Sequence, residues 1–143
     1  MSLGAAFRIM HRQTDACYIK YGITAKQFVL LVLLAEEDGI TQQELVERAA
    51  SDPNTIRAML VLLEKKGMVK REQDPTDGRK HHITITNKGC TTYKNALKDS
   101  EPIRKLIYSN FNADELKMLI MFLNRITESL GSSDILNHKR LKK

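Results

Sequence analysis

Residues 52–89 have the sequence DPNTIRAMLVLLEKKGMVKREQDPTDGRKHHITITNKG, and this stretch decides the fold. Asp52 is a strong helix N-cap, and Pro53 suits the first helical position, where the amide that proline lacks would have no partner. Gly67 follows two lysines and is a typical helix C-cap. The residues between them place one apolar face at helical spacing: Ile56, Met59, Leu60 and Leu63. The stretch therefore begins with an amphipathic helix that ends near Lys66.

A β-hairpin is predicted directly after this helix. Residues 69–71 and 82–86 alternate in side-chain character, and the second run is rich in β-branched residues. The segment between them, residues 74–78, is DPTDG, which is dense in turn formers. Thr86 or Asn87 then begins another helix, which Pro102 is expected to kink or interrupt.

Capping boxes predict three further helix starts. In this motif the N-cap side chain and the side chain three residues later each accept a hydrogen bond from the other's backbone amide. The three pairs are Thr24 with Gln27, Thr41 with Glu44, and Asn112 with Glu115. A looser apolar stripe indicates a first helix over residues 5–21, and the last helix ends near Gly131. The predicted fold class is mainly α with a small β-hairpin, in the order four helices, hairpin, two helices.

The short helix from Thr41, a tight connection at residues 50–51 and the helix from Asp52 form a helix-turn-helix pattern, to which the hairpin adds a wing. In such proteins the N-terminal part of the second helix approaches the bases in the major groove. Its exposed face carries residue types that pair with adenine or guanine or that contact the thymine methyl group. The alternative is an ordinary solvated face. The candidate DNA-binding residues are Thr41, Gln42, Asn54, Thr55, Arg57, Ala58, Val61 and Lys65.

The predicted wing is basic. Arg79, Lys80 and His81 follow its turn, where cations can reach phosphates or the adjacent minor groove. An ordinary polar turn is the alternative. We expect Asp77 to pair with Arg79 and hold the tip of the wing in shape.

Composition agrees with a single globular domain that has a polyanionic partner. The 143 residues carry a net charge of +6 and are 42% hydrophobic and 28% charged. The two cysteines are too few for a disulfide framework and suit a cytoplasmic protein. The longest apolar run, residues 28–35, is too short to cross a membrane. No enzyme motif or metal-site spacing is present, so we expect a non-catalytic protein without a cofactor.

Two motifs resemble the MarR (multiple antibiotic resistance regulator) family. Residues 74–79, DPTDGR, followed by residues 83–89, ITITNKG, are similar to the family's wing pattern, although Ile85 stands where leucine is commoner. Residues 22–31 and 62–71 are also similar to family segments. The resemblance covers residues 5–130.

This resemblance implies a winged helix-turn-helix protein that forms a homodimer and binds a pseudo-palindromic operator in double-stranded DNA, usually as a repressor. It implies that Arg79 reaches into the minor groove and that Asp77 braces it. Within one domain, residues 1–143, we expect dimerisation helices at 5–21 and 87–130 and a DNA-binding lobe at 24–86. Residues 131–143 would form a basic tail.

Many members of the family release DNA when a phenolic or other lipophilic effector binds. An aromatic carboxylate would suit a pocket with cations for the acid group and rings to stack. The alternative is that the candidate residues are exposed or belong to an interface of an amphipathic helix. These candidates are Arg8, His11, Arg12, Tyr18 and Tyr21.

Two other functions are weaker alternatives. One branch of the family senses peroxides through an N-terminal cysteine, but that cysteine lies further from the Gly-Ile-Thr motif than Cys17 does here. A winged-helix module that binds protein instead of DNA would associate with duplex weakly and independently of salt. The basic wing argues against that module.

Overall fold

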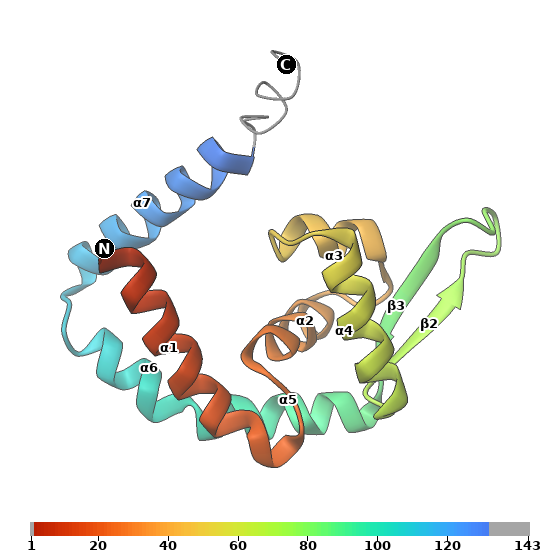
Figure 1. Ribbon diagram of the computed structural model, residues 1–143, viewed down its shortest axis with the longest axis horizontal. Coiled ribbons are helices and arrows are strands. Elements are labelled where there is room, and N and C mark those ends of the chain that lie inside the picture. Colours follow the sequence, from red (N-terminus) through yellow and green to blue (C-terminus); the bar gives the residue numbers. More distant parts are fainter. Residues whose placement is uncertain (1, 132–143) are drawn as a thin grey trace, which may run out of the picture. The chain divides into compact units, whose positions relative to one another are not determined.

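The computed structural model describes residues 2–131, so most of the expected basic tail lies outside the described residues. The described chain is mostly helical, with one small sheet (Figure 1). It divides into two compact units between Ile103 and Arg104. The elements are α1 (Ser2–Tyr18), η1 (Ile19–Tyr21), α2 (Ala25–Glu36), β1 (Ile40–Thr41), α3 (Gln42–Arg48), α4 (Pro53–Lys65), β2 (Val69–Gln73), β3 (His81–Ile85), α5 (Asn87–Asp99), α6 (Glu101–Tyr108) and α7 (Ala113–Gly131).

The three predicted capping boxes are all present. In each, the N-cap side chain accepts a hydrogen bond from the third helical amide, and the third side chain accepts one from the N-cap amide. The bonds join Thr24 to Gln27 (3.2 and 3.0 Å) at α2, Thr41 to Glu44 (3.2 and 2.7 Å) at α3, and Asn112 to Glu115 (2.9 and 2.9 Å) at α7. Local sequence thus determines where these helices begin.

Helix α4 also begins and ends as predicted. The Asp52 carboxylate accepts a hydrogen bond from the Thr55 amide at 2.9 Å, and Pro53 occupies the first turn. Gly67 has a φ of +72°, the left-handed conformation that glycine adopts without a steric penalty. The amide of Met68 then bonds back to the Leu63 carbonyl at 2.9 Å, which closes the helix end.

The connection between α3 and α4 uses the same kind of turn without a glycine. Ala50 has a φ of +47°, and the Ser51 amide donates to the Val46 carbonyl at 3.1 Å. A left-handed alanine is disfavoured, so the contacts around it must hold the turn in place. This turn sets how α4 leaves α3.

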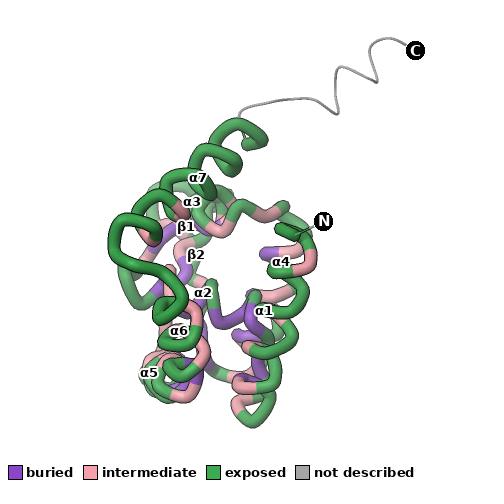
Figure 2. Tube along the Cα trace, turned by 90° about the vertical axis from the view of Figure 1, so that its left-hand side faces the viewer, coloured by how far each residue is buried: buried purple, intermediate pink, exposed green. Residues whose placement is uncertain are grey.

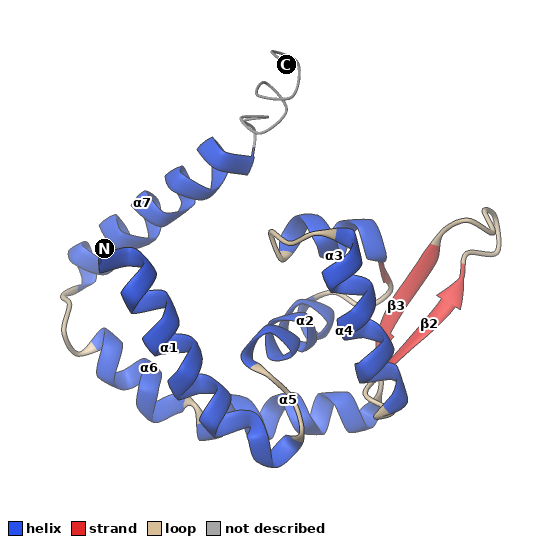
Figure 3. Cartoon of the chain, in the orientation of Figure 1, coloured by secondary structure: helices blue, strands red, loops and turns tan. Residues whose placement is uncertain are grey.

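The sheet has the strand order β1-β3-β2 and is antiparallel throughout. The predicted hairpin is confirmed, with Arg71 opposite Ile83, and Figure 3 shows it projecting beyond the helices. The sequence did not predict β1, in which Ile40 also pairs with Ile83. A two-residue strand has no pattern of its own, and its partner lies 43 positions away.

The start of α5 is fixed against the end of α4. The Thr86 hydroxyl donates to the Gly67 carbonyl at 2.6 Å, and the Thr86 amide donates to the Met68 carbonyl at 3.0 Å. A Cβ placed on Gly89 would lie 2.1 Å from the Met68 carbonyl oxygen, so no side chain fits there. The predicted interruption near Pro102 is confirmed, because α5 ends at Asp99 and α6 begins at Glu101.

The core of the first unit lies among α2, α3, α4 and the sheet. Figure 2 shows buried segments in these elements, whereas α7 is mostly exposed and has no buried residue. The Tyr18 ring joins this core from α1 and stacks on Phe28, with ring centroids 4.5 Å apart. Helices α2, α3 and α4 contribute core side chains that are fully shielded from solvent: Leu30, Leu31, Leu34, Leu45, Ile56, Leu60 and Leu63.

Candidate nucleic-acid interface

Helix α4 turns a polar and basic face to solvent. Because Ile56, Leu60 and Leu63 are buried, the opposite side of the helix is free to meet a partner. Five of the predicted base-reading residues on α4 lie on this side, four of them exposed and Val61 half-buried: Asn54, Arg57, Ala58, Val61 and Lys65. This is the surface that a recognition helix requires.

Two predicted contact residues also stabilise helix starts. The Thr55 hydroxyl donates to the Asp52 carboxylate at 2.6 Å. The Thr41 hydroxyl lies 3.1 Å from the Glu44 carboxylate and accepts from the Glu44 amide. These hydroxyls therefore stabilise helix starts, and only the methyl groups of the two threonines remain to contact a base. Gln42, next to Thr41, is half-buried at the start of α3.

Asp74 organises the turn of the wing. Its carboxylate accepts hydrogen bonds from the Thr76 amide at 2.7 Å, the Thr76 hydroxyl at 2.6 Å and the Asp77 amide at 3.2 Å. These bonds, with a further one from His82, hold the pKa of Asp74 far below its usual range, so it is an anion. The Asp74 amide in turn donates to the Lys80 carbonyl at 2.9 Å and closes the loop.

Asp77 and Arg79 pair through the backbone of Arg79 and not through its guanidinium. The Asp77 carboxylate accepts from the Arg79 backbone amide at 3.0 Å, and no ion pair joins their side chains. A two-residue separation brings the carboxylate to the nearby amide, as in an Asx turn. Asp77 thus braces the backbone of the tip, while the guanidinium of Arg79 extends into solvent.

One hollow brings the wing, α3 and α4 together. It has a volume of about 360 Å³ and a mostly polar lining. Three basic side chains from the wing and one from α4 border it together with the first turn of α3. The lining residues are Thr41, Gln42, Gln43, Glu44, Arg57, Arg79, Lys80 and His81. Six of the predicted contact residues therefore share one surface.

His82 was not among the predicted site residues. Its ring Nδ1 lies 2.8 Å from the Gly39 carbonyl oxygen, and its Nε2 lies 2.6 Å from a carboxylate oxygen of Asp74. The pKa of His82 is raised, chiefly by the hydrogen bond to Asp74 and then by the one to Gly39. The sequence predicted that His82 lies on a strand, but it did not indicate the contact with Gly39, which lies 43 positions away.

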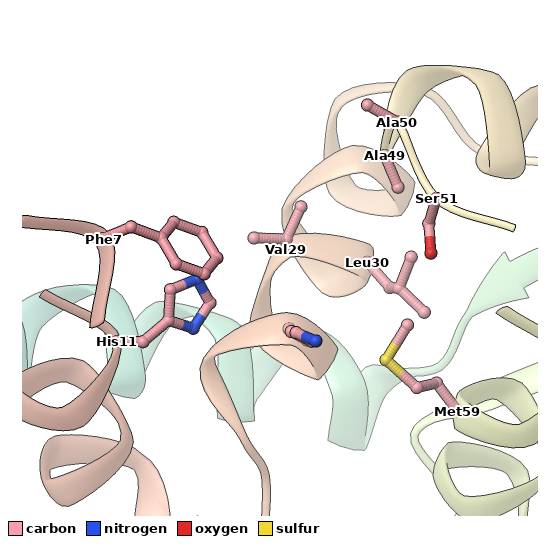
Figure 4. A pocket seen from close by; sticks show the side chains of 9 residues that line it. Phe7, His11, Val29, Leu30, Ala49, Ala50, Ser51 and Met59 are labelled. Atoms are coloured by element: carbon pink, nitrogen blue, oxygen red, sulfur yellow. The ribbon is translucent and has the colours of Figure 1, made fainter. Parts of the chain in front are cut away.

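A second cavity, of about 450 Å³, lies between α1, α2 and the turn that leads into α4. Figure 4 shows Phe7 and His11 of α1 on one side, Val29 and Leu30 of α2 in the middle, and Ala49, Ala50, Ser51 and Met59 on the other side. Lys26 completes the lining. The cavity is mainly apolar, with a few polar groups at its edge.

Of the five predicted effector residues, only His11 lines this cavity. Tyr18 is buried in the core, where its ring packs on Phe28. The Tyr21 hydroxyl donates to the Asp99 carboxylate at 2.5 Å, and Lys20 forms an ion pair with the same group at 2.6 Å. Arg8 and Arg12 are exposed on α1 and lie outside the cavity lining. The helical stripe placed these residues on α1 but did not show which of them face α2.

Residues 2–131 contain no cluster of three or more histidine, cysteine, aspartate or glutamate side chains arranged to bind a metal ion. Cys17 and Cys90 are free thiols and half-buried. Within the same range no single helix is long and apolar enough to cross a membrane, although residues 2–21 and 25–36, a pair bent by 74°, reach that length and composition together.

Comparison with known proteins identifies the family. The sequence model of the MarR family matches residues 23–81, from the turn before α2 to the start of β3. The uncharacterised HTH-type transcriptional regulator YdgJ of Bacillus subtilis strain 168 is 31% identical over 111 residues, which are 78% of this chain and 68% of that protein. The match thus extends well beyond the helix-turn-helix.

Solved structures share this fold over most of the chain. The MepR–DNA complex of S. aureus has a TM-score of 0.80 at 21% identity, over 90% of this chain and 94% of the other. The PcaV transcriptional regulator of Streptomyces coelicolor, in complex with its natural ligand, has a TM-score of 0.77 at 21% identity, over 89% and 92% of the two chains. The chain belongs to the MarR family and is a winged-helix transcriptional regulator rather than an enzyme.

Proposed function

We propose that the protein is a homodimeric repressor that binds a pseudo-palindromic operator with α4 in the major groove and the wing at the minor groove. The observation that carries this proposal is the hollow in which Arg57 of α4 meets Arg79, Lys80 and His81 of the wing. Clustered cations displace counterions from phosphates, and a helix face with asparagine and arginine can read base edges. The MepR–DNA complex supports this use of the fold.

Dimerisation is proposed from the helices outside the DNA-binding lobe. Residues 24–86 would form that lobe, whereas 5–21 and 87–130 would form the dimer. The support is a set of large apolar side chains that are 40–62% exposed on α7 and 46–56% exposed on α1. Each helix thus exposes several large apolar side chains of its own, and such groups of exposed apolar side chains mark interaction sites. In a two-fold dimer, the recognition helices would reach half-sites roughly 10 base pairs apart.

Selection of bound duplexes from a random pool would test the proposal and supply the operator. We expect a palindromic consensus. With that duplex, Arg79→Ala should weaken binding at all sequences and reduce the salt dependence, because it removes one cation from the surface that faces the DNA. Asn54→Ala or Arg57→Ala should cost on the order of 1–3 kcal/mol at particular bases.

Lys94→Ala provides the matched control, because Lys94 is an exposed cation on α5 outside the proposed DNA-binding surface. Since α5 belongs to the proposed dimerisation helices, size-exclusion chromatography first checks that this variant has the oligomeric state of the wild type. Unchanged affinity in the Asn54, Arg57 and Arg79 variants would reject the surface. Weak binding that does not respond to salt would favour the protein-interaction alternative. A transcriptional regulator must reach its operator, so we place this activity in the cytoplasm.

We also propose that a small aromatic carboxylate relieves repression by binding the cavity between α1 and α2. Phe7, Leu30 and Met59 offer apolar contacts, and Lys26 and His11 offer cationic or hydrogen-bonding groups for the acid. An occupant would touch the strained turn at Ala50 and so bear on the orientation of α4. The ligand-bound PcaV structure supports this use of the fold.

Thermal denaturation with a panel of benzoates tests this second step. We expect at least one compound to raise the melting temperature and to release the selected duplex. Lys26→Met should abolish both effects, whereas Arg12→Met should preserve them, because Arg12 lies outside the cavity lining. If no compound shifted the melting temperature, the cavity would not be an effector site for this class.

A further inference from the structure

His82 lies between two hydrogen-bond acceptors. Its Nδ1 is 2.8 Å from the carbonyl oxygen of Gly39, and its Nε2 is 2.6 Å from the carboxylate of Asp74. The His82 side chain is 35% exposed and that of Asp74 is 15% exposed, so water competes only partly for these bonds. Both ring nitrogens are therefore engaged.

The chemistry of the acceptors determines the charge of the ring. A carbonyl oxygen only accepts hydrogen bonds, and an ionised carboxylate also only accepts. A neutral imidazole has one N–H and can therefore satisfy one of the two partners, whereas the imidazolium has two N–H groups. The arrangement is complete only when His82 carries a positive charge.

These two bonds join distant parts of the DNA-binding lobe. Gly39 immediately precedes β1, and Thr41 at the end of β1 is the N-cap of α3. Asp74 is the residue on which the wing loop closes, through its bonds to Thr76 and Asp77. A protonated His82 thus connects the loop of the wing, through Asp74, to the segment that leads into the helix-turn-helix.

We propose that His82 is a positioning residue whose protonated ring holds the wing loop to the segment that precedes α3, so that affinity for DNA falls as the pH rises. This inference rests on the proposed role of the wing in DNA binding. His82 itself need not contact DNA, because it acts through Asp74 and the loop that presents Arg79.

The surroundings of His82 favour its charged form. Asp74 faces it from the wing loop, Glu44 from α3, and Glu72 lies opposite on β2. Arg48 interacts with Glu44 but is itself paired with Glu37 at 2.6 Å. The carboxylate of Asp38, in the turn before β1, accepts from the Gly39 amide. The charged side chains that raise the pKa of His82, Asp74 and Glu44, are both anions.

The raised pKa determines the direction of the effect. Histidine ordinarily titrates near about 6.5. Since the folded protein holds the proton more tightly, the bridge is complete below that value and is lost as the pH rises through the higher folded pKa of His82. Wing position, and with it DNA affinity, should change in that window.

Nitrogen-15 NMR of the free protein tests the charge state without DNA. We expect both ring nitrogens of His82 to be protonated at pH 6, with a titration midpoint above about 6.5. Asp74→Asn should lower the midpoint. A midpoint at or below the ordinary value, or no effect of Asp74→Asn, would overturn the proposal.

Operator binding tests the consequence. Affinity for the selected duplex is measured from pH 6 to 8.5 at constant ionic strength. His82→Gln should weaken binding at pH 6 on the order of threefold to tenfold, the effect of one hydrogen bond, and should flatten the pH profile. His81→Gln identifies what the other histidine of the wing contributes. His81 belongs to the proposed DNA-binding surface, so this variant should bind more weakly, and the pH dependence that it keeps but that His82→Gln loses belongs to His82.

Circular dichroism confirms that each variant is folded before affinities are compared. If His82→Gln bound with the wild-type pH profile, the positioning role would be wrong while the proposed function stood. If the wild type bound no duplex at any pH, the proposed function would fail, and the inference about affinity would fail with it. The NMR midpoint distinguishes these two results.

Discussion

Helices α4 and α7 have the same amphipathic pattern, but the apolar face of α4 is buried and that of α7 is exposed. In α4, Ile56, Leu60 and Leu63 are completely buried. In α7, Ile120 is 55% exposed and Leu123 is 40% exposed, and no residue of the helix is buried. Spacing therefore shows that a helix has an apolar face, but it does not show whether that face packs within its own chain. For α7 we propose that a second copy of the chain covers it.

The largest effect should come from truncating the core of α4. Leu60→Ala removes a fully buried side chain and should lower the free energy of unfolding by roughly 2–5 kcal/mol. Ile120→Ala on α7 should have an effect that depends on protein concentration, because its side chain is buried only in the proposed dimer. Urea unfolding at two concentrations distinguishes the two variants. Equal, concentration-independent losses would mean that α7 packs on its own chain.

A pair of glycines gives the next contrast. Gly89→Ala would place a Cβ 2.1 Å from the Met68 carbonyl oxygen, so the start of α5 must move, at a cost of about 1–3 kcal/mol. At Gly131, the end of α7, an added Cβ would meet no atom within 4 Å, so Gly131→Ala should change stability by less than about 0.5 kcal/mol. Thermal melts of both variants measure the difference. A neutral Gly89→Ala would show that this contact is loose.

The sequence predicted those features that local chemistry determines. The capping boxes, the Asp52-Pro53 start, the left-handed Gly67 and the polar turn of the hairpin each depend on residues within about five positions of one another. The exposed face of α4 followed from its buried face by helical geometry. These predictions needed no knowledge of the rest of the fold.

The features that the sequence did not show depend on distant contacts. Tyr18 was expected in a pocket but packs on Phe28, and the cavity near α1 is completed by the turn at Ala50. His82 bonds to Gly39 across 43 positions. Helical spacing places such residues on a face, whereas tertiary packing decides what the face meets. The pair of Asp77 with Arg79 is local, but the sequence did not show that the Asp77 carboxylate would bind the Arg79 amide and not its guanidinium.

Mutations of helix caps should have similar effects in the packed core and in α7, because a cap depends only on residues close in sequence. Thr24→Ala at α2 and Asn112→Ala at α7 each delete the acceptor for a helical amide and should each cost about 1 kcal/mol. Chemical denaturation measures the first cost. Loss of helicity by circular dichroism reports the second if α7 unfolds separately. A cost at Thr24 several times larger would mean that this residue also supports the core.

The smallest expected effect concerns the capping boxes of α2 and α3, which both lie in the proposed DNA-binding lobe. The box of α2 uses neutral Gln27, whereas that of α3 uses Glu44, whose pKa is lowered by its bonds to the Thr41 amide and hydroxyl. Because the folded pKa lies below the unfolded one, this bond stabilises the protein above the ordinary glutamate pKa of about 4.3 and is lost as the pH falls through the folded value. Glu44→Gln gives the capping box of α3 the same neutral side chain as the box of α2. Stability of the variant should thus lose part of its dependence on pH below about 4.3 while remaining close to wild type at neutral pH. If the variant lost stability in acid as the wild type does, the lowered pKa of Glu44 would contribute nothing to the stability of the folded protein.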